Sequence, residues 1–113
     1  MAHFINITAD KLDITNSEGN NAIVFHIPGH CAGCKRALEL INEMAFDGKL
    51  ADWNFYLIDA ENDTNKVLID KYEATIAPTI ITFKSGVKMN RTNGLKEFIQ
   101  QKDKLFTNET NAN

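Results

Sequence analysis

Two cysteines, Cys31 and Cys34, lie where an apolar run typical of a buried strand meets an amphipathic run typical of a helix. The run before them, residues 22–27, is apolar on both faces, as expected for a central parallel strand. After them, apolar residues recur at steps of three and four over residues 34–45, which predicts a helix with one buried side. This junction predicts an α/β fold and places both thiols at the first turn of the helix.

Further apolar runs predict one mixed sheet with helices on both faces. Strands are expected over residues 4–7, 53–60, 79–83 and 87–91, the last two joined as a hairpin through Lys84, Ser85 and Gly86. A weak helix capped by Thr8 or Asp10 is expected over residues 8–13, followed by a turn over residues 16–21. A second helix, capped by Asn62 or Asp63, is expected to bury Val67, Leu68 and Tyr72. A final helix carries its apolar residues on one stripe, namely Leu95, Phe98, Ile99, Leu105 and Phe106. We predict one domain over residues 1–106 and a polar, frayed tail over residues 107–113.

Composition narrows the classes of function. The chain has 113 residues, 43% of them apolar and 24% charged, as is ordinary for a soluble globular protein, and its net charge of -3 provides no basic field for nucleic acid. Residues 1–6 lack the features of a signal peptide, and no apolar run approaches the roughly 20 residues that span a bilayer. We therefore expect a cytoplasmic monomer that binds neither nucleic acid nor membranes.

The cysteine count favours chemistry over a structural disulfide. In a reducing compartment, a single C-x-x-C is more often catalytic or metal-binding than structural. A structural zinc site needs four Cys or His ligands. Beyond the two cysteines, the chain offers only three histidines, His3, His26 and His30. Haem attachment needs a histidine after the second cysteine, where Lys35 stands. We expect no metal and no bound cofactor, and we interpret His26, inside a strand pattern, as structural.

The arrangement as a whole resembles the thioredoxin family over nearly the full chain. The features that match are the C-x-x-C at the strand-to-helix junction, Ile76-Ala77-Pro78-Thr79 after a second strand and helix, Gly86 in the hairpin and Gly94 before the last helix. The resemblance implies the thioredoxin fold, with a central mixed sheet flanked by helices on both faces. It also implies that Pro78 is a cis-proline beside the cysteines, that disulfide-containing proteins are the substrates, and that a separate NADPH-dependent thioredoxin reductase is the electron donor.

Several positions depart from the family pattern. In the motif, His30, Ala32 and Gly33 stand where the family usually has Trp, Gly and Pro. Six positions before the first cysteine, Phe25 takes the place of a buried Asp, and its partner Lys falls at Leu57. The proline that kinks the family's active-site helix is replaced near Glu39, so we expect a straighter helix. These differences put the family's proton relay and its reduction potential in question for this chain. The thiol–disulfide chemistry itself needs only the two cysteines.

The positions of the two thiols predict their order of attack. Cys31, at the start of the helix, lies near unpaired backbone N–H groups that favour its thiolate, and Cys34, one turn further, is expected to be buried and to act as the resolving thiol. Gly33 offers one more N–H donor than proline, which predicts a potential above the roughly -270 mV of thioredoxin. His30 is either a cation that favours the Cys31 thiolate or a loop residue without a role.

A substrate surface is expected beside the cysteines. If Pro78 is cis, the backbone near Ala77 is free to pair with an extended substrate segment, and Ile76 and Pro78 form an apolar rim. Together with His30, Ala32 and Gly33, these residues are the predicted substrate-binding set.

We predict a thiol–disulfide oxidoreductase that cycles between the Cys31–Cys34 disulfide and dithiol. One alternative is a glutaredoxin-like, glutathione-dependent reductase, although the paired glycines used by such proteins are absent around residues 92–94. A second alternative is a binding module whose thiols are incidental, which the residues at Phe25 and Leu57 leave open.

Overall fold

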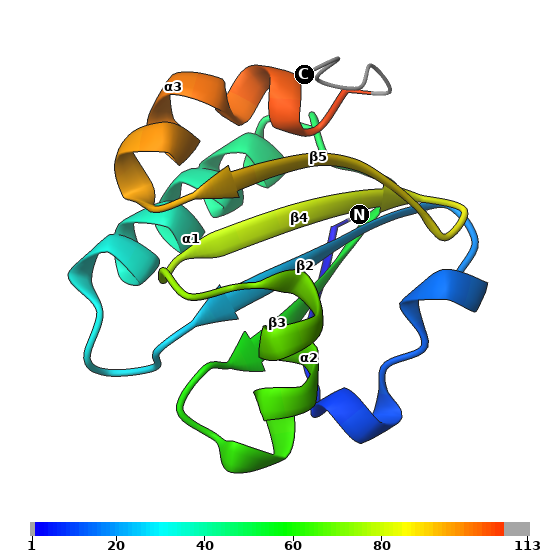
Figure 1. The fold of residues 1–113 in the computed structure, drawn as a ribbon. Coiled ribbons are helices and arrows are strands. Elements are labelled where there is room, and N and C mark those ends of the chain that lie inside the picture. Colours follow the sequence, from blue (N-terminus) through cyan, green and yellow to red (C-terminus); the bar gives the residue numbers. More distant parts are fainter. Residues whose placement is uncertain (1, 108–113) are drawn as a thin grey trace.

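In the computed structural model, which describes residues 2–107, five strands form one mixed sheet in the order β1-β3-β2-β4-β5 (Figure 1). The strands are β1 (His3–Asn6), β2 (Asn20–His26), β3 (Trp53–Asp59), β4 (Thr79–Lys84) and β5 (Val87–Asn93). The strands β1, β2 and β3 run parallel to one another, β4 pairs antiparallel with β2, and β5 pairs antiparallel with β4. The predicted mixed sheet is confirmed. Of the predicted polar tail, residues 108–113 lie outside the described residues.

Three helices cover the two faces of this sheet. They are α1 (Ala32–Phe46), α2 (Lys66–Tyr72) and α3 (Leu95–Leu105). The helices α1 and α3 lie on one face and α2 lies on the other, as Figure 1 shows. The prediction of helices on both faces is therefore confirmed. Within residues 2–107, every helix is too short or too polar to reach across a bilayer.

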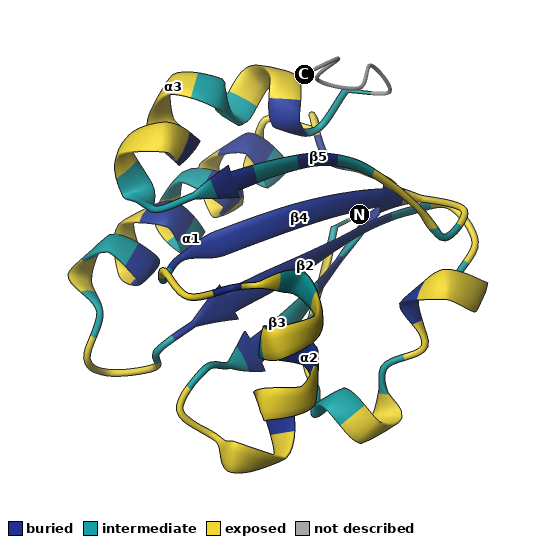
Figure 2. Ribbon diagram, in the orientation of Figure 1, coloured by how far each residue is buried: buried dark blue, intermediate teal, exposed yellow. Residues whose placement is uncertain are grey.

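The strand β2 is buried throughout its second half and separates two apolar clusters (Figure 2). Ala22 and Val24 pack with residues of α1 and α3, whereas Ile23 and Phe25 pack with residues of α2. Side chains alternate between the faces of a strand, so the next residue, His26, returns to the face that α1 covers. This alternation decides which side chains of β2 lie near the cysteines.

The segment before β2 differs from the prediction. Instead of one weak helix over residues 8–13, it contains two short 3₁₀ turns, η1 (Ala9–Lys11) and η2 (Ile14–Asn16), and Thr8 makes no side-chain cap at the first. The Ala9 amide donates to Oδ1 of Asn65 at 2.8 Å, so a distant residue takes the role expected of a local cap. Tertiary contacts therefore override a weak local preference here.

The predicted turn over residues 16–21 is wrong at its end, because Asn20 and Asn21 belong to β2. Asn21 is fully buried, but its amide donates to the Glu18 carbonyl and its Oδ1 accepts from Asn54. With its polar side chain satisfied in this way, an asparagine can occupy a central strand that its composition disfavours.

The helices match the predictions in position and differ in some buried residues. Asn62 is the predicted cap, and its Oδ1 accepts from the Thr64 amide at 3.0 Å at the start of a 3₁₀ turn, η3 (Asp63–Asn65), that leads into α2. Val67 on α2 and Ile99 on α3 are exposed, contrary to the prediction. The residues that these helices bury are Leu68 on α2 and Phe98 and Leu105 on α3.

Candidate active site at the start of helix α1

Cys31 and Cys34 form a disulfide whose Cα atoms lie 5.2 Å apart. Cys31 is the N-cap residue of α1 in an extended conformation, and Cys34 lies in the first turn. Cys34 is only 2% exposed, whereas Cys31 is half-buried. The expectation that the first thiol is the accessible one and the second is covered is therefore confirmed.

The sulfur of Cys31 accepts a hydrogen bond from the helix. The donor is the amide of Cys34, 3.1 Å from Cys31 Sγ. The additional N–H donor expected from Gly33 concerns the reduced thiolate, so the predicted rise in reduction potential stays a prediction. The helix dipole also stabilises a negatively charged side chain that accepts a hydrogen bond from a backbone N–H at the helix N-terminus. A Cys31 thiolate would be such a side chain.

The loop before β4 packs against the other side of the cysteines. The peptide bond between Ala77 and Pro78 is cis, as the resemblance implied, and the Ala77 carbonyl oxygen lies 3.8 Å from Cys31 Sγ. The Gly94 amide donates to the Pro78 carbonyl at 2.7 Å, which joins this loop to the start of α3. Pro78 is buried, so of the two residues predicted as an apolar rim only Ile76, 53% exposed, presents its side chain to solvent.

Gly33 is enclosed by two side chains of this neighbourhood. A Cβ at position 33 would lie 3.4 Å from Leu95 Cβ and 3.6 Å from Pro78 Cδ. Leu95, the first residue of α3, is therefore a member of the site that the sequence did not identify. Gly94 just before it was noticed, but nothing in the sequence tells which surface the start of a helix will touch.

The cysteines also line a cavity of about 650 Å³ that Pro78 does not border. Both thiols border it, together with the exposed residues His30 and Ala32. His26, at the end of β2, also borders it. Of the predicted site residues, Gly33 and the segment 76–78 do not line this cavity. The structure thus gives Cys31 two different surroundings, with an apolar loop on one side and an open cavity with two histidines on the other.

His26, rather than Phe25, is the residue of β2 that faces the cysteines. Phe25 packs in the cluster on the α2 face, and its aromatic ring lies near that of Tyr72, so it cannot act on Cys34. His26 is 8% exposed, and its register partner on β3 is Asp59, not Leu57, which pairs with Val24. The correspondence of Phe25 and Leu57 to the family's acid and lysine stays a prediction, and of the two only Leu57 lies on the face that α1 covers. The in-and-out alternation from Ala22 was the signal in the sequence that could have identified His26.

Burial lowers the pKa of His26, and the carboxylate of Asp59 opposes this shift in part. The folded protein therefore binds a proton at His26 less readily than the unfolded chain does. The contribution of His26 to the free energy of unfolding should be largest above the ordinary histidine pKa of about 6.5. As the pH falls below that value, the free energy of unfolding should decrease by no more than about 1.4 kcal/mol per pH unit, the limit for one proton. We expect His26→Gln to flatten this part of the curve, measured by urea denaturation of the disulfide form between about pH 5 and pH 8. An equally steep curve in the variant would contradict the assignment.

Within residues 2–107, no group of three or more His, Cys, Asp or Glu side chains is arranged to hold a metal ion.

Comparisons with known proteins agree with the fold. No protein-family model matches the sequence, and a search of curated proteins gives no match. Solved structures do match. Thioredoxin O2 from Arabidopsis thaliana in its oxidized state has a TM-score of 0.72 and 19% identity, over 92% of this chain and 95% of that one. Thioredoxin from Trypanosoma brucei brucei has a TM-score of 0.69 and 18% identity, over 87% and 84%.

A third match, Fasciola hepatica thioredoxin, has a TM-score of 0.60 and 22% identity, over 78% of this chain and 80% of that one. At these identities the likeness concerns the fold. This chain has the thioredoxin fold.

Proposed function

We propose that this protein is a thiol–disulfide oxidoreductase that reduces or exchanges protein disulfides through the Cys31–Cys34 couple. The observation that carries the proposal is a C-x-x-C disulfide at a helix N-terminus, with an accessible first sulfur, a buried second sulfur and a cis-proline beside them. Exchange chemistry needs a thiolate that can attack and a second thiol within reach of it, and this pair supplies both.

The cycle uses only these two sulfurs. In the dithiol form, the Cys31 thiolate attacks one sulfur of a substrate disulfide, forms a mixed disulfide and releases the other substrate sulfur as a thiolate. Cys34 then attacks Cys31 Sγ, the bond to the substrate breaks, and the second substrate sulfur leaves. Two electrons pass to the substrate, and the Cys31–Cys34 disulfide forms. This order follows from the exposure of the two sulfurs, because only Cys31 is accessible to a large disulfide.

Disulfide-containing proteins are the proposed substrates. The backbone of Ala77 lies beside Cys31, and the preceding residue, Ile76, exposes its side chain, an arrangement suited to an extended segment of another chain. Ala32 and His30 border the same sulfur on the cavity side. Recognition through main-chain groups and one apolar contact would accept many different sequences around the target disulfide.

Ile76 provides a test of this surface. Ile76→Asp is expected to lower kcat/KM for insulin reduction by about tenfold, since an apolar contact is lost and a carboxylate must be desolvated. The rate at which the variant reduces a small disulfide reagent should stay within about twofold of the wild-type rate, because such a reagent does not cover Ile76. The matched control is Phe46→Ser, at the opposite end of α1, where the side chain is 91% exposed. Equal losses for insulin and for the small reagent would contradict a docking role for Ile76.

The electron donor is proposed to be a separate NADPH-dependent thioredoxin reductase, with glutathione as the rival. An insulin-reduction assay driven either by NADPH with thioredoxin reductase or by glutathione with glutathione reductase distinguishes the two. Turnover with neither donor, although the reduced protein reacts with insulin, would indicate another donor. Absence of any reaction between the reduced protein and insulin would refute the proposed function.

We further propose a cytoplasmic monomer that does not bind nucleic acid or membranes and carries redox electrons for the cell. The cysteine usage and the charge of -3 support this. The alternative of a binding module, which the apolar residues Phe25 and Leu57 left open, stays a second candidate.

A further inference from the structure

We propose that Arg91 of β5 is a positioning residue for protein substrates, because its guanidinium fixes the loop between α2 and β4 (residues 73–78, the α2–β4 loop). This loop carries Ile76 and the Ala77 backbone, the two groups proposed above to meet an extended substrate chain. The inference rests on the proposed function, because it concerns how a protein disulfide is held beside Cys31. It assigns a role to an arginine that the thiol chemistry described above does not use.

The guanidinium of Arg91 holds the end of α2. The register partner of this half-buried residue on β4, Ile81, packs in the cluster on the α2 face, so Arg91 points toward α2. Its Nη1 donates to the carbonyl of Tyr72, the last residue of α2, and its Nη2 donates to the Glu73 carbonyl at 2.9 Å. A helix leaves its last carbonyls without a partner inside the helix. One planar guanidinium therefore satisfies two such carbonyls where the α2–β4 loop begins.

The remaining contact of Arg91 links it to the far end of the same loop. Its Nε donates to Oδ1 of Asn93 at 2.8 Å. The next residue, Gly94, donates its amide to the Pro78 carbonyl at 2.7 Å. A Cβ at Gly94 would lie 3.6 Å from Cγ2 of Ile76, so the junction of β5 and α3 also borders the side chain proposed to meet the substrate. Arg91 thus connects the start of the α2–β4 loop to the junction that holds its end.

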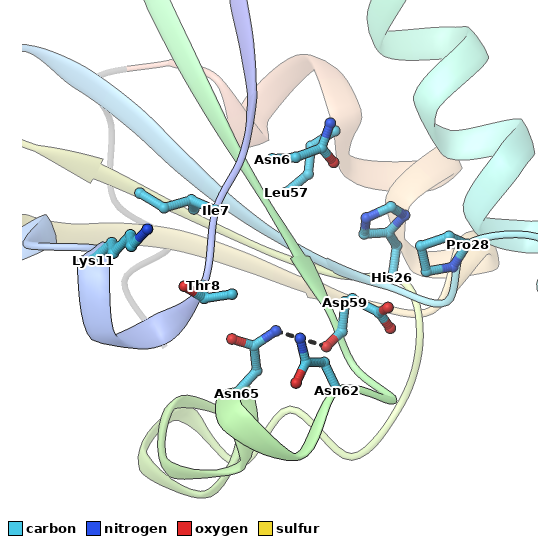
Figure 3. A pocket seen from close by; sticks show the side chains of 10 residues that line it. All are labelled: Asn6, Ile7, Thr8, Lys11, His26, Pro28, Leu57, Asp59, Asn62 and Asn65. Carbon is cyan, nitrogen blue, oxygen red and sulfur yellow. Dashed lines mark hydrogen bonds between the residues drawn. The ribbon is translucent and has the colours of Figure 1, made fainter.

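The other end of α2 is held independently of Arg91. Asn65, in the turn η3 that leads into α2, donates from Nδ2 to the Asp59 carbonyl at 2.9 Å (Figure 3). Both residues border a cavity of about 410 Å³ that the cysteines do not line. Oδ1 of Asn65 also accepts from the Ala9 amide. Loss of the Arg91 contacts should therefore loosen the end of α2 and the α2–β4 loop, while the start of α2 stays in place.

The partners of Arg91 are uncharged. Among residues 2–107, no carboxylate forms an ion pair with its guanidinium. Its hydrogen bonds go to two carbonyls and one side-chain amide oxygen. A guanidinium presents its donors in a fixed planar fork, whereas a lysine ammonium is a compact charge on a flexible stem. Arg91→Lys should therefore keep the charge but hold the α2–β4 loop less well.

The first test compares a protein disulfide with a small one. Arg91→Met keeps an unbranched apolar stem and removes the donors. In single turnover of the pre-reduced full-length chain, the insulin concentration that gives half of the maximal rate should rise at least about fivefold, because a loosened loop must be ordered when the substrate binds. The maximal rate, and the rate of attack on 5,5′-dithiobis(2-nitrobenzoate), should stay within about twofold of wild type, since the Cys31 thiolate is unchanged.

A double-mutant cycle tests whether Arg91 acts through the α2–β4 loop. Ile76→Asp alone is expected to lower kcat/KM for insulin about tenfold. In the Arg91→Met protein the same change should lower it by less than about threefold, because the loop no longer holds Ile76 against the substrate. Losses that multiply in full in the double variant would mean that the two residues act independently, and would overturn the inference.

Two further variants separate positioning from charge and from stability. Arg91→Lys should recover only part of the loss seen in Arg91→Met. Full recovery would show that the charge alone is sufficient and would overturn the inference. Gly48→Ala strains a turn after the end of α1, where φ is +79°, and should lower stability while the dependence on insulin concentration stays within about twofold of wild type. A loss in Gly48→Ala equal to that in Arg91→Met would reduce the effect to stability.

The outcomes are separable. A folded Arg91→Met variant with the wild-type dependence on insulin concentration, or with equal losses for insulin and the small reagent, would overturn the inference and leave the proposed function intact. If that variant does not fold by circular dichroism, Arg91→Lys takes its place, and a wild-type dependence on insulin concentration in it overturns the inference. Failure of the reduced wild-type protein to react with insulin would refute the proposed function itself.

Discussion

Cys31→Ser is expected to lose the ability to reduce insulin by more than about 1,000-fold, because a hydroxyl cannot replace the thiolate as nucleophile. The remaining cysteine, Cys34 in the first turn of α1, is only 2% exposed, so its sulfur cannot reach a protein disulfide. The measurement is a single-turnover reaction of the pre-reduced variant with insulin, quenched with acid, in which mass spectrometry counts the free insulin thiols.

Cys34→Ser is the matched control, because it removes the other sulfur and leaves the first step. This variant should attack insulin at close to the wild-type rate and then stop as a covalent mixed disulfide at Cys31. The adduct should disappear on addition of dithiothreitol. A comparable adduct on Cys34 in the Cys31→Ser protein would reverse the order of attack that we infer from exposure.

The sequence was sufficient for the parts of the site that depend on local pattern. The period of three and four over residues 34–45 located α1, and the cysteines fell at its first turn, so the disulfide and the order of exposure followed. The cis peptide before Pro78 came from the family resemblance alone. Local periodicity and a short motif were enough because each concerns residues adjacent in the chain.

The parts that were missed depend on how distant segments meet. Leu95 covers Gly33 only because α3 packs beside α1, and the Ala9 amide finds Asn65 across the fold. For His26 the information was present, since the alternation along β2 fixes the face of each side chain. Counting six residues back from Cys31 instead drew attention to Phe25, whose side chain lies on the opposite face. A count along the chain does not say which face a side chain takes, whereas the alternation along a strand does.

Gly86 provides the largest expected effect on stability. The tight hairpin between β4 and β5 has positive φ at Ser85 and Gly86, and its Ser85 amide donates to the Gly19 carbonyl at 2.9 Å. A Cβ at position 86 would lie 2.8 Å from the carbonyl carbon of Thr15 and closer still to its oxygen. Gly86→Ala therefore adds a strained backbone, about 1–3 kcal/mol, to an overpacked contact of about 1–3 kcal/mol. We expect a loss of about 2–6 kcal/mol in the free energy of unfolding.

Gly48→Ala separates the two causes. Gly48 has φ +79°, close to the +83° of Gly86, but a Cβ there meets nothing within 4 Å. Its substitution should cost only the backbone term of about 1–3 kcal/mol. Urea denaturation of the three disulfide-form proteins gives both values, provided that their m-values agree. Equal losses in the two variants would mean that the η2 segment yields to the new methyl group, and that the contact between the hairpin and Thr15 does not constrain the fold.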